Sequence, residues 1–484
     1  MSRPRTVVIV GGGISGLATA FAVQEQAAAK GLSLQCTVLE SDSSWGGKIV
    51  THRIGDLVTE AGPDSFLSQK QAGLDLCGKL GLTDQLINTN ETGKRAFVLY
   101  RGRLHELPEG LVSFVPKQLG PFLRSGLLSW TGLARMGLDV LIPRGPAEGD
   151  ESLASFFRRR FGTQAFERVL EPLMAGIYAG DAEQMSLKAT FPRFFELEQQ
   201  YGSIIRGMTA AKKPAPPVSS SGPKRTMFVS LKNGLSDLVT TLRARLEQQG
   251  ADCRLRCRVE AVRVRSHQPG RWMYDLILDD GSPLSTESLV LATPAYVSAD
   301  LLRPLTPIAG GLLEMIPYAS TATIAMAYPE QLVMGAVEGF GFIVPRIEGR
   351  DLIAATWTSL KWPHRAPAGQ VLIRCYVGGV GREPILQLDD TELVARVRAE
   401  LSALCGMTAN PTYVEVNRWW KAMPQYTLGH LNRLGQLDAA LSRYPGLVLT
   451  GAGYRGVGIP DCIRDGALAA DRIVRYLSGD RAPS

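Results

Sequence analysis

Cysteine and histidine are scarce in this sequence, which has seven cysteines and five histidines among 484 residues. The cysteines are odd in number and scattered, so the sequence predicts free thiols in a reducing compartment instead of a disulfide framework. Neither a C-x-x-C nor an H-E-x-x-H spacing occurs. A metal site built from protein side chains is therefore not expected.

Long uncharged runs are also lacking, with one exception near the N-terminus. Residues 6–24 are 19 uncharged residues that follow Arg3 and Arg5, a pattern that resembles a signal peptide or a short membrane span. Three consecutive glycines at 11–13 interrupt the run, and a membrane span has little use for them. The sequence thus predicts neither a cleaved signal nor a transmembrane helix. We expect a cytoplasmic protein that is soluble or attached to the membrane surface.

A strong charge of either sign is missing as well. The net charge is +7, from 53 Lys+Arg against 46 Asp+Glu, and no basic stripe interleaved with aromatic residues accompanies it. Nucleic-acid binding is therefore not expected, whereas an anionic small ligand or an acidic membrane surface suits the surplus. With 45% hydrophobic and 20% charged residues, the composition is that of a globular protein. The length predicts two or three domains, and monomer and homodimer both stay open.

A β-α-β unit with a glycine-rich turn begins near the N-terminus. The β-branched run at 6–10 predicts a buried strand, GGGISG follows at 11–16, and a second strand ends at Glu40. Gly11, Gly13 and Gly16 match the G-x-G-x-x-G spacing, which serves the tight turn, the close approach of a pyrophosphate and the packing of helix on strand. The helix start offers free N–H groups to phosphates. The sequence therefore predicts a dinucleotide site, and Glu40 disfavours NADP because it would repel a 2′-phosphate.

Two further glycine-rich segments accompany this unit. WGGK lies at 45–48, and GAGYRGVGIPDCI at 451–463 stands between a predicted strand and a predicted helix. Glycines in the second segment let main-chain amides reach a ligand, and the helix start favours the electron-rich edge of a flavin.

Together the three segments resemble the FAD-binding amine oxidase and phytoene desaturase superfamily. The resemblance implies FAD as the cofactor. We expect it to be held non-covalently, because Cys462 stands in PDCI and not in the S-G-G-C of covalent amine oxidases. The implied cofactor-binding residues are Gly11, Gly13, Ile14, Ser15, Gly16, Glu40, Ser41, Gly46, Gly47, Lys48, Gly62, Pro63, Asp64, Ser65, Val259, Trp419, Gly451, Val457, Gly458 and Ile459.

Four more segments sharpen the resemblance. GPDSFL at 62–67, FFRRRFG at 156–162, EPLMAGIYAGD at 171–181 and MPQYTLGH at 423–430 are similar to those of the porphyrinogen oxidases of haem biosynthesis, in the same order over essentially the whole chain. The Gram-positive type is the most similar. The resemblance implies a six-electron oxidation of a porphyrinogen in three two-electron steps through FAD, with oxygen as oxidant and peroxide as product. No catalytic acid–base residue is implied, because the flavin carries the redox work. Protoporphyrinogen IX and coproporphyrinogen III both stay open.

The same resemblance implies a pocket for the tetrapyrrole and two departures from the family pattern. Plant and animal members place an arginine after the GP motif, where this sequence has Leu67, so Lys70 is the nearest candidate for a substrate carboxylate. Trp419 and Trp420 stand where relatives have one tryptophan, and Trp419 is interpreted either as a flavin neighbour or as a core aromatic. The implied substrate-binding residues are Lys70, Gly176, Phe340, Ile343, Thr356, Tyr376 and Met423.

The expected fold class is α/β: a Rossmann-like FAD-binding domain, an antiparallel-sheet substrate domain and a helical domain that faces the membrane. The FAD-binding domain is assigned to 1–80, 226–300 and 430–484, the substrate domain to 81–110 and 301–429, and the helical domain to 111–211. Residues 212–225, rich in Pro and Ser, are predicted to be a mobile linker. A basic amphipathic surface compatible with membrane contact is formed by Phe114, Val115, Lys117, Phe122, Leu123, Arg124, Leu127, Leu128, Trp130 and Arg135. Internal packing of the same residues is the alternative.

Two other functions compete with this interpretation. One is a different enzyme of the superfamily, such as an amine oxidase or carotenoid desaturase. The other is a flavin-binding membrane or scaffold protein without turnover, against which the porphyrinogen-type pocket segments argue.

Overall fold

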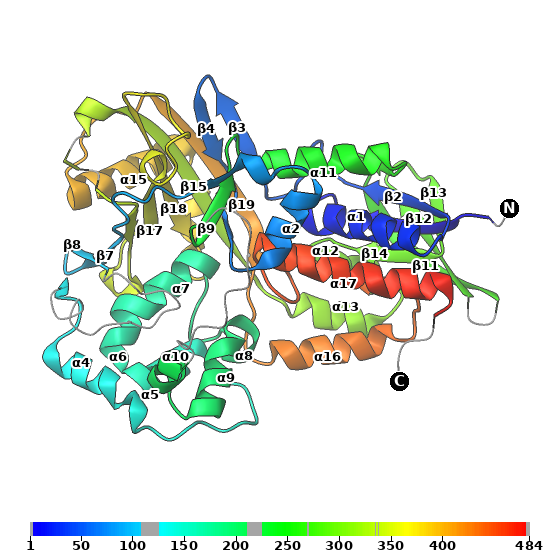
Figure 1. Cartoon of the computed structure of the whole chain (residues 1–484), viewed down its shortest axis with the longest axis horizontal. Coiled ribbons are helices and arrows are strands. Elements are labelled where there is room, and N and C mark those ends of the chain that lie inside the picture. Colours follow the sequence, from blue (N-terminus) through cyan, green and yellow to red (C-terminus); the bar gives the residue numbers. More distant parts are fainter. Residues whose placement is uncertain are drawn as a thin grey trace.

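The predicted β-α-β unit near the N-terminus is present in the structure. The computed structural model describes residues 3–107, 125–210, 225–268, 271–333, 335–336 and 338–480. Strand β1 (Arg5–Val10), helix α1 (Ile14–Ala29) and strand β2 (Leu34–Leu39) make the expected β-α-β unit. They belong to a parallel five-stranded sheet of order β10-β2-β1-β14-β20 (Figure 1), completed by β10 (Asp252–Arg254), β14 (Ser288–Leu291) and β20 (Leu447–Leu449).

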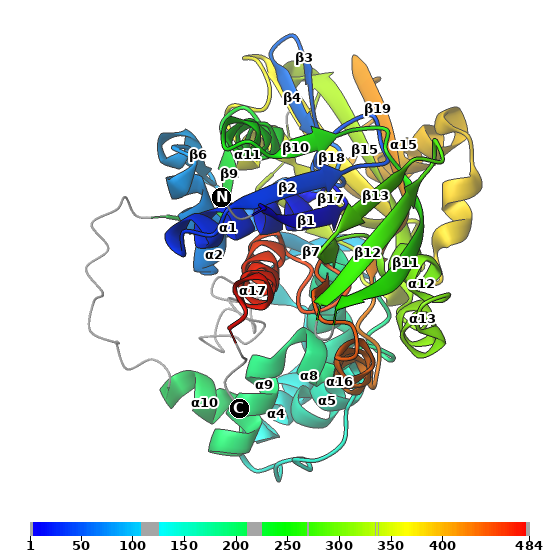
Figure 2. The ribbon, with the colours of Figure 1, turned by 90° about the vertical axis from the view of Figure 1, so that its right-hand side faces the viewer.

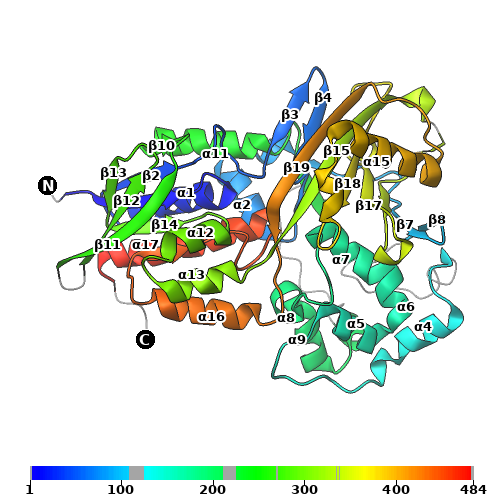
Figure 3. The same cartoon turned by 180° about the vertical axis from the view of Figure 1, so that it is seen from behind.

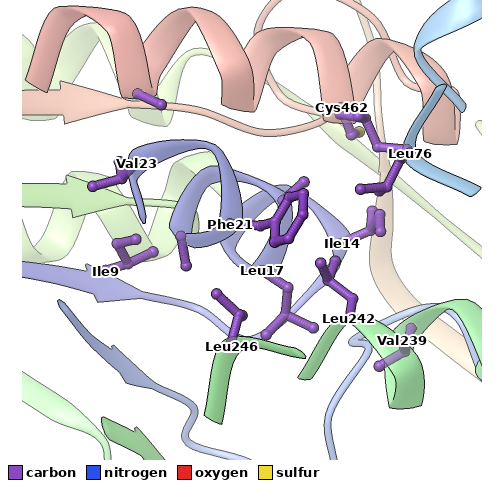
Figure 4. Packing of buried hydrophobic residues seen from close by; sticks show 14 of the residues in the cluster. Ile9, Ile14, Leu17, Phe21, Val23, Leu76, Val239, Leu242, Leu246 and Cys462 are labelled. Atoms are coloured by element: carbon purple, nitrogen blue, oxygen red, sulfur yellow. The ribbon is translucent and has the colours of Figure 1, made fainter. Parts of the chain in front are cut away.

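Both faces of this sheet are covered, which explains its continuous apolar strands. Val7 and Ile9 of β1 face the cluster under α1, α11 (Ser236–Gln248) and α17 (Ile459–Ser478), and Figure 4 shows Leu17, Phe21 and Ile9 within it. Helices α1 and α17 lie side by side (Figure 2). Val8 and Val10 face the opposite cluster, under a second layer seen from behind in Figure 3. That layer contains β11 (Val259–Gln268), β12 (Arg271–Leu278), β13 (Pro283–Thr286), α12 (Ala295–Leu302), α13 (Pro307–Glu314) and α16 (His430–Leu441).

A second sheet has seven strands in the order β19-β15-β18-β17-β16-β7-β8. Its strands are mainly antiparallel, as the sequence predicts for a substrate domain, but β16 pairs with β7 in parallel, and the edge strand β19 was not predicted. One face packs on helix α15 (Asp390–Cys405) through a buried apolar cluster. The strands are β7 (Phe97–Tyr100), β8 (Arg103–Glu106), β15 (Tyr318–Pro329), β16 (Gly341–Ile343), β17 (Leu352–Trp357), β18 (Gln370–Gly378) and β19 (Tyr413–Pro424).

The segment from 125 to 210 is helical, as predicted, and packs around its own core. Leu127 and Leu128 are 0% and 5% exposed, so these two residues belong to the interior and not to the proposed membrane surface; Trp130 is 75% exposed. The residues of the proposed membrane surface from Phe114 to Arg124 lie outside the described residues. The elements are α4 (Trp130–Gly137), α5 (Leu153–Phe161), α6 (Thr163–Ala165), a π-helical turn (Phe166–Leu170), α7 (Glu171–Tyr178), α8 (Leu187–Thr190), α9 (Pro192–Tyr201) and α10 (Ile204–Ala210).

Short elements connect these layers and carry the GP segment. The elements are β3 (Thr51–Ile54), β4 (Leu57–Glu60), β5 (Phe66–Leu67), α2 (Gln71–Lys79), β6 (Leu86–Asn88), β9 (Phe228–Leu231) and α14 (Thr358–Lys361), with 3₁₀ turns at Thr83–Gln85, Leu138–Val140, Glu330–Leu332, Arg346–Glu348 and Glu383–Gln387. The predicted linker lies outside the described residues except for Arg225, whose guanidinium donates to the carbonyl oxygens of Leu86 and Thr83. In the described part of the chain, no helix is long and apolar enough to cross a membrane.

Candidate active site

The glycines of the first turn divide into packing positions and one open position. A Cβ atom on Gly16 would lie 1.9 Å from the carbonyl oxygen of Gly11, and one on Gly11 would lie 2.8 Å from that of Ala292. A Cβ atom on Gly13 would meet nothing nearer than the carbonyl oxygen of Gly46, at 4.0 Å. Gly11 and Gly16 are therefore needed for close packing of the backbone, whereas Gly13 borders open space at the start of α1.

Glu40 is oriented by main-chain donors at the end of β2. Its carboxylate accepts from the N–H of Gly12 (2.7 Å) and of Asp42 (2.8 Å), and it is 8% exposed. The Ser41 hydroxyl also donates to Oε1 (3.2 Å), so Oε2 is the oxygen that retains acceptor capacity for a further hydroxyl. The chain before β11 passes beside it, because the N–H of Cys257 donates to the Glu40 carbonyl oxygen (2.9 Å). Val259 follows two residues later, with its side chain buried in the core, so only its main chain is available to a ligand.

The WGGK segment folds against this turn. The N–H of Gly46 donates to the carbonyl oxygen of Gly12 (2.9 Å), and Gly46 and Gly47 both have positive φ, which favours glycine. The Cβ position of Gly47 faces the Cα of Gly13 at 3.4 Å. Lys48 comes next, and burial lowers the pKa of its ammonium. Within the described part of the chain, Lys48 forms no hydrogen bond or ion pair.

The GP segment is pinned between the first turn and the second sheet. A Cβ atom on Gly62 would lie 1.7 Å from the carbonyl oxygen of Lys48. The carbonyl oxygen of Ala61 accepts three bonds from the sheet: from Trp419 (2.8 Å), Thr323 (2.9 Å) and Arg374 (3.1 Å). The indole of Trp419 thus points toward the GP segment, while Trp420 is half exposed.

Asp64 faces α14 and the residue that follows it. Its carboxylate accepts from Lys361 (3.1 Å) and Trp362 (3.3 Å). Burial alone would raise the pKa of Asp64, but the charges of Lys361 and Arg374 outweigh it and hold that pKa well below its usual range. Because the side chain of Asp64 is satisfied by the protein, the main chain of the GP segment is what remains for a cofactor.

The C-terminal glycine loop runs from β20 into α17. Asp465 of α17 accepts from the hydroxyl of Thr450 (2.8 Å) and the N–H of Gly451 (3.1 Å), which ties the start of the loop to the helix. Helix α17 begins at Ile459, inside the glycine-rich segment, because Pro460 suits the first helical turn. Gly458 precedes the helix without a side-chain cap and Pro460 has no N–H, so the N–H groups of Ile459 and Asp461 are the ones left for a ligand at the start of α17.

These features fit a dinucleotide such as FAD. The space beside Gly13 and Gly47 is open to a pyrophosphate, and α1, like α17, begins without a side-chain cap. Lys48 supplies a cation that has no partner in the described chain, at the place where phosphates would lie. A glycine-rich turn that binds nothing would not need this combination.

The second sheet presents three of the expected pocket residues, Ile343, Thr356 and Tyr376, on one face. In the strand register, Ile343 lies opposite Ala354, which lies opposite Tyr376, and Thr356 lies opposite Arg374. Residues directly opposite each other share a face. The other face is the one that packs on α15, so these residues are free to line a pocket. Phe340, Ile343, Thr356, Tyr376 and Met423 are all half-buried.

Helix α7 closes this face from the helical domain. The Cβ position of Gly176 is 3.9 Å from the Cγ2 atom of Ile343, so a larger side chain at 176 would reduce the space beside the sheet. Half-buried aliphatic, aromatic and methionine side chains suit an apolar ligand with a flat ring system.

Lys70 does not lie free at the pocket. Its ammonium is 2.5 Å from the carboxylate of Asp461 in the first turn of α17; Lys70 is 44% exposed and Asp461 is 6% exposed. Arg464 is a second partner of Asp461, at 3.4 Å. The pairing brings Lys70 to the cofactor loop, but the carboxylate that it contacts belongs to the chain itself.

Sequence reasoning missed Arg374 and Tyr426. Arg374 is 4% exposed, donates to the carbonyl oxygens of Ala61 and Gly62, and lies two residues before Tyr376 on the same face. A single arginine inside the apolar run VLIRCYV was the available signal, because a charge in a buried strand needs a specific partner. Tyr426 belongs to the MPQY segment, and its hydroxyl reaches the C-terminal glycine loop.

All seven cysteines are free, as expected. Burial raises the pKa of the Cys462 thiol to about 11. Among the described residues, no three His, Cys, Asp or Glu side chains are grouped so that they could hold a metal ion.

Comparison with known proteins agrees with this geometry. The profile of the flavin containing amine oxidoreductases matches residues 14–474. The chain is 38% identical over 472 residues to the coproporphyrinogen III oxidase of Bacillus subtilis (strain 168), covering 97% of this chain and 98% of the relative. It is 33% identical to the chloroplastic protoporphyrinogen oxidase of Oryza sativa subsp. japonica, covering 97% and 88%. A crystal structure from Exiguobacterium sp. 255-15 superposes with a TM-score of 0.84 at 33% identity, covering 98% and 99%.

Proposed function

Because this chain belongs to the family of flavin containing amine oxidoreductases, we propose that it oxidises coproporphyrinogen III to the porphyrin, with FAD as cofactor and oxygen as oxidant. The observation that carries the proposal is similarity over nearly the full length of both chains to the coproporphyrinogen III oxidase of Bacillus subtilis, at 38% identity. The pocket face of the second sheet, with its half-buried apolar and aromatic side chains, suits a tetrapyrrole.

The chain's own residues bind and orient the reactants. FAD, when bound, supplies the redox chemistry by accepting two electrons at a time. Gly13, Gly47 and the uncapped start of α1 would hold its pyrophosphate, and Glu40 would accept from ribose hydroxyls. The main-chain N–H groups at the start of α17 would favour negative charge on the flavin ring of FAD. The GP segment, which Arg374 and Trp419 hold by hydrogen bonds, would lie between the flavin ring and the second sheet.

The tetrapyrrole would lie on the pocket face, between the sheet and α7. Tyr376, Ile343 and Phe340 would contact the macrocycle, while Gly176 leaves room for it and Met423 borders the cofactor side. Removing six hydrogens from the porphyrinogen transfers six electrons, so three oxygen molecules are reduced to three hydrogen peroxide molecules for each porphyrin formed. No side chain needs to form a covalent bond, and the protein contributes orientation and exclusion of water.

Parallel assays test this function. The purified FAD-containing protein is supplied with coproporphyrinogen III or protoporphyrinogen IX, and porphyrin fluorescence and peroxide are recorded together. We expect three peroxides per porphyrin and a kcat/KM at least tenfold higher for coproporphyrinogen III. A preference for protoporphyrinogen IX would reverse the substrate assignment, and absence of turnover with both would overturn the function.

Lys70 is proposed to contact a substrate carboxylate, a role that Leu67 cannot take over from the arginine of other family members. Its ammonium is half exposed and sits on a flexible stem, so it can turn from Asp461 to a propionate. Arg464 would keep Asp461 paired while Lys70 is engaged elsewhere. Coproporphyrinogen III carries four propionates and protoporphyrinogen IX carries two, so the contact would favour the former.

FAD is proposed to be bound without a covalent link. Cys462 is the cysteine of the C-terminal loop region, and its thiol is 3.8 Å from the carbonyl oxygen of Gly456. Because burial raises the pKa of that thiol to about 11, little thiolate would be present for attack. Acid precipitation should leave all of the yellow colour in the supernatant; flavin retained in the pellet would contradict the proposal.

Contact with a membrane surface is proposed for the helical domain around Trp130 and Leu141, which are 75% and 72% exposed. Exposed large apolar side chains of this kind suit the interface of a bilayer. The protein should co-sediment with phosphatidylglycerol vesicles, and the double variant Trp130→Ser, Leu141→Ser should bind them at least fivefold more weakly. Equal sedimentation of both proteins would contradict the assignment of this surface.

A further inference from the structure

The C-terminal glycine loop is held in place by a side chain from the MPQY segment. The hydroxyl of Tyr426 donates to the carbonyl oxygen of Ala452 (2.6 Å) and accepts from the N–H of Gly456 (2.8 Å). Tyr426 is 2% exposed, so water does not replace these bonds. One phenol group therefore closes the turn between Ala452 and Gly456, and the buried side chain of Tyr454 anchors the same turn in the core.

His430 holds the middle of the same loop. Its Nε2 atom lies 2.9 Å from the carbonyl oxygen of Tyr454, and since a carbonyl only accepts, the proton is on Nε2. The imidazole stacks on the ring of Tyr426, with centroids 4.2 Å apart and planes at 15°. Burial lowers the pKa of His430 to about 4, so the ring is neutral at physiological pH. The two stacked side chains thus bond to three points of the loop.

We infer that Tyr426 and His430 are positioning residues that set the glycine loop and the start of α17 against the flavin. The inference rests on the proposed placement of FAD at Gly451, Val457 and Gly458. Neither residue needs to touch the cofactor, because each acts through loop backbone that leads directly into the uncapped helix start.

The same segment also joins the loop to the tetrapyrrole pocket. Met423, a proposed pocket residue, lies three residues before Tyr426. The Tyr426 carbonyl oxygen accepts from the N–H of Ser186 (2.8 Å), and Met185 forms a strand bridge with Thr427. A shift of Tyr426 would therefore move the cofactor loop relative to both the sheet and the helical domain.

Tyr426→Phe tests the inference, because it keeps the ring and its stacking but removes both hydrogen bonds. The buried N–H of Gly456 then lacks its acceptor, so the loop should relax. We expect FAD to dissociate about tenfold faster, the visible circular dichroism of the flavin to change, and its midpoint potential to become more negative, because α17 is less well aligned with the ring system. With porphyrinogen, kcat should fall at least fivefold while KM changes less than twofold.

Tyr444→Phe is the matched control. The Tyr444 hydroxyl donates to the carbonyl oxygen of Leu305 (2.7 Å), away from the glycine loop. This variant removes one hydrogen bond where Tyr426→Phe removes two, so it should lose less unfolding free energy, and it should keep wild-type flavin dissociation, dichroism and potential. Equal flavin properties in Tyr426→Phe and wild type would overturn the inference, and so would an equal change in Tyr444→Phe.

His430→Phe is a second variant, in case Tyr426→Phe does not fold. It retains an aromatic stack and removes one of the three bonds, so flavin dissociation should be about threefold faster; wild-type dissociation would count against the inference. The flavin measurements need no porphyrinogen. A wild-type protein that binds FAD but oxidises neither porphyrinogen would therefore refute the proposed function and leave this test intact.

Discussion

Gly13 and Gly16 lie three residues apart in one turn, yet alanine should affect them in opposite ways. At Gly13, φ is −72° and ψ is 176°, an extended conformation that any residue adopts, and the nearest atom to an added Cβ is 4.0 Å away. Gly13→Ala should therefore leave the free energy of unfolding unchanged or raise it by up to about 1 kcal/mol. At Gly16, a Cβ atom would lie 1.9 Å from the carbonyl oxygen of Gly11, against a normal carbon–oxygen contact of about 3.3 Å. Backbone would have to move by more than about 1 Å, and Gly16→Ala should cost about 3 kcal/mol or more.

Among the variants that fold, FAD affinity should fall more in Gly13→Ala than in Gly16→Ala, the reverse of their order in stability. The space beside Gly13 is the one assigned to the pyrophosphate, so Gly13→Ala should weaken FAD binding at least tenfold, or about 1.4 kcal/mol. Gly13→Val, whose branched side chain reaches further, should be isolated without flavin.

The assays are urea unfolding of the FAD-free proteins and titration with FAD followed by quenching of flavin fluorescence. Gly47→Ala serves as a comparison, because it borders the same space but has a φ of +58° and should lose stability as well. A Gly13→Val protein that purifies with its full complement of flavin would refute the assignment of this space to FAD.

Other perturbations probe the substrate side and the buried charges. Lys70→Ala should raise KM three- to tenfold with little change in kcat, and the rise should be larger for the four-propionate substrate; the lost ion pair should cost about 1 kcal/mol of unfolding free energy, because the Lys70 side chain is half exposed. Asp461→Asn, which frees Lys70, should not raise KM. Unchanged kinetics in Lys70→Ala would show that Lys70 only tethers α17 through Asp461. Arg374→Met should cost about 3 kcal/mol in urea unfolding, since the carbonyl oxygen of Gly62 loses its donor and Asp64 loses a neighbouring cation; a loss below about 1 kcal/mol would contradict the role of Arg374. The pKa of His430 is about 4 in the folded protein against 6.5 in the unfolded chain, so its contribution to the free energy of unfolding is fully present above pH 6.5 and falls by up to about 3 kcal/mol as the pH drops to 4. His430→Phe should remove that part of the pH dependence. An unchanged dependence of the unfolding free energy on pH would show that the titration of His430 does not cause it.

The sequence by itself determined the parts of the protein that depend on local pattern. The β-α-β unit, its glycine spacing and the acid at Glu40 were readable because strand, turn and helix follow one another within 40 residues, where backbone geometry leaves few alternatives. The close packing predicted for Gly11 and Gly16 agrees with the added Cβ distances, whereas the pyrophosphate contact of Gly13 stays a prediction.

Only the tertiary structure decided which polar groups meet across long stretches of chain. Lys70 and Asp461 are 391 residues apart, and nothing in GPDSFL or in PDCI indicates that one would engage the other. Strand β19 was not predicted, because half-buried edge residues interleaved with charged ones give a weak alternation signal, and its pairing with β15 is what brings Trp419 to Ala61. The burial of Leu127 and Leu128 was equally hidden, since an amphipathic pattern shows that one face is apolar but not whether protein or membrane covers it. Periodicity records which side of an element avoids water, and the partner on that side depends on the packing of the whole chain.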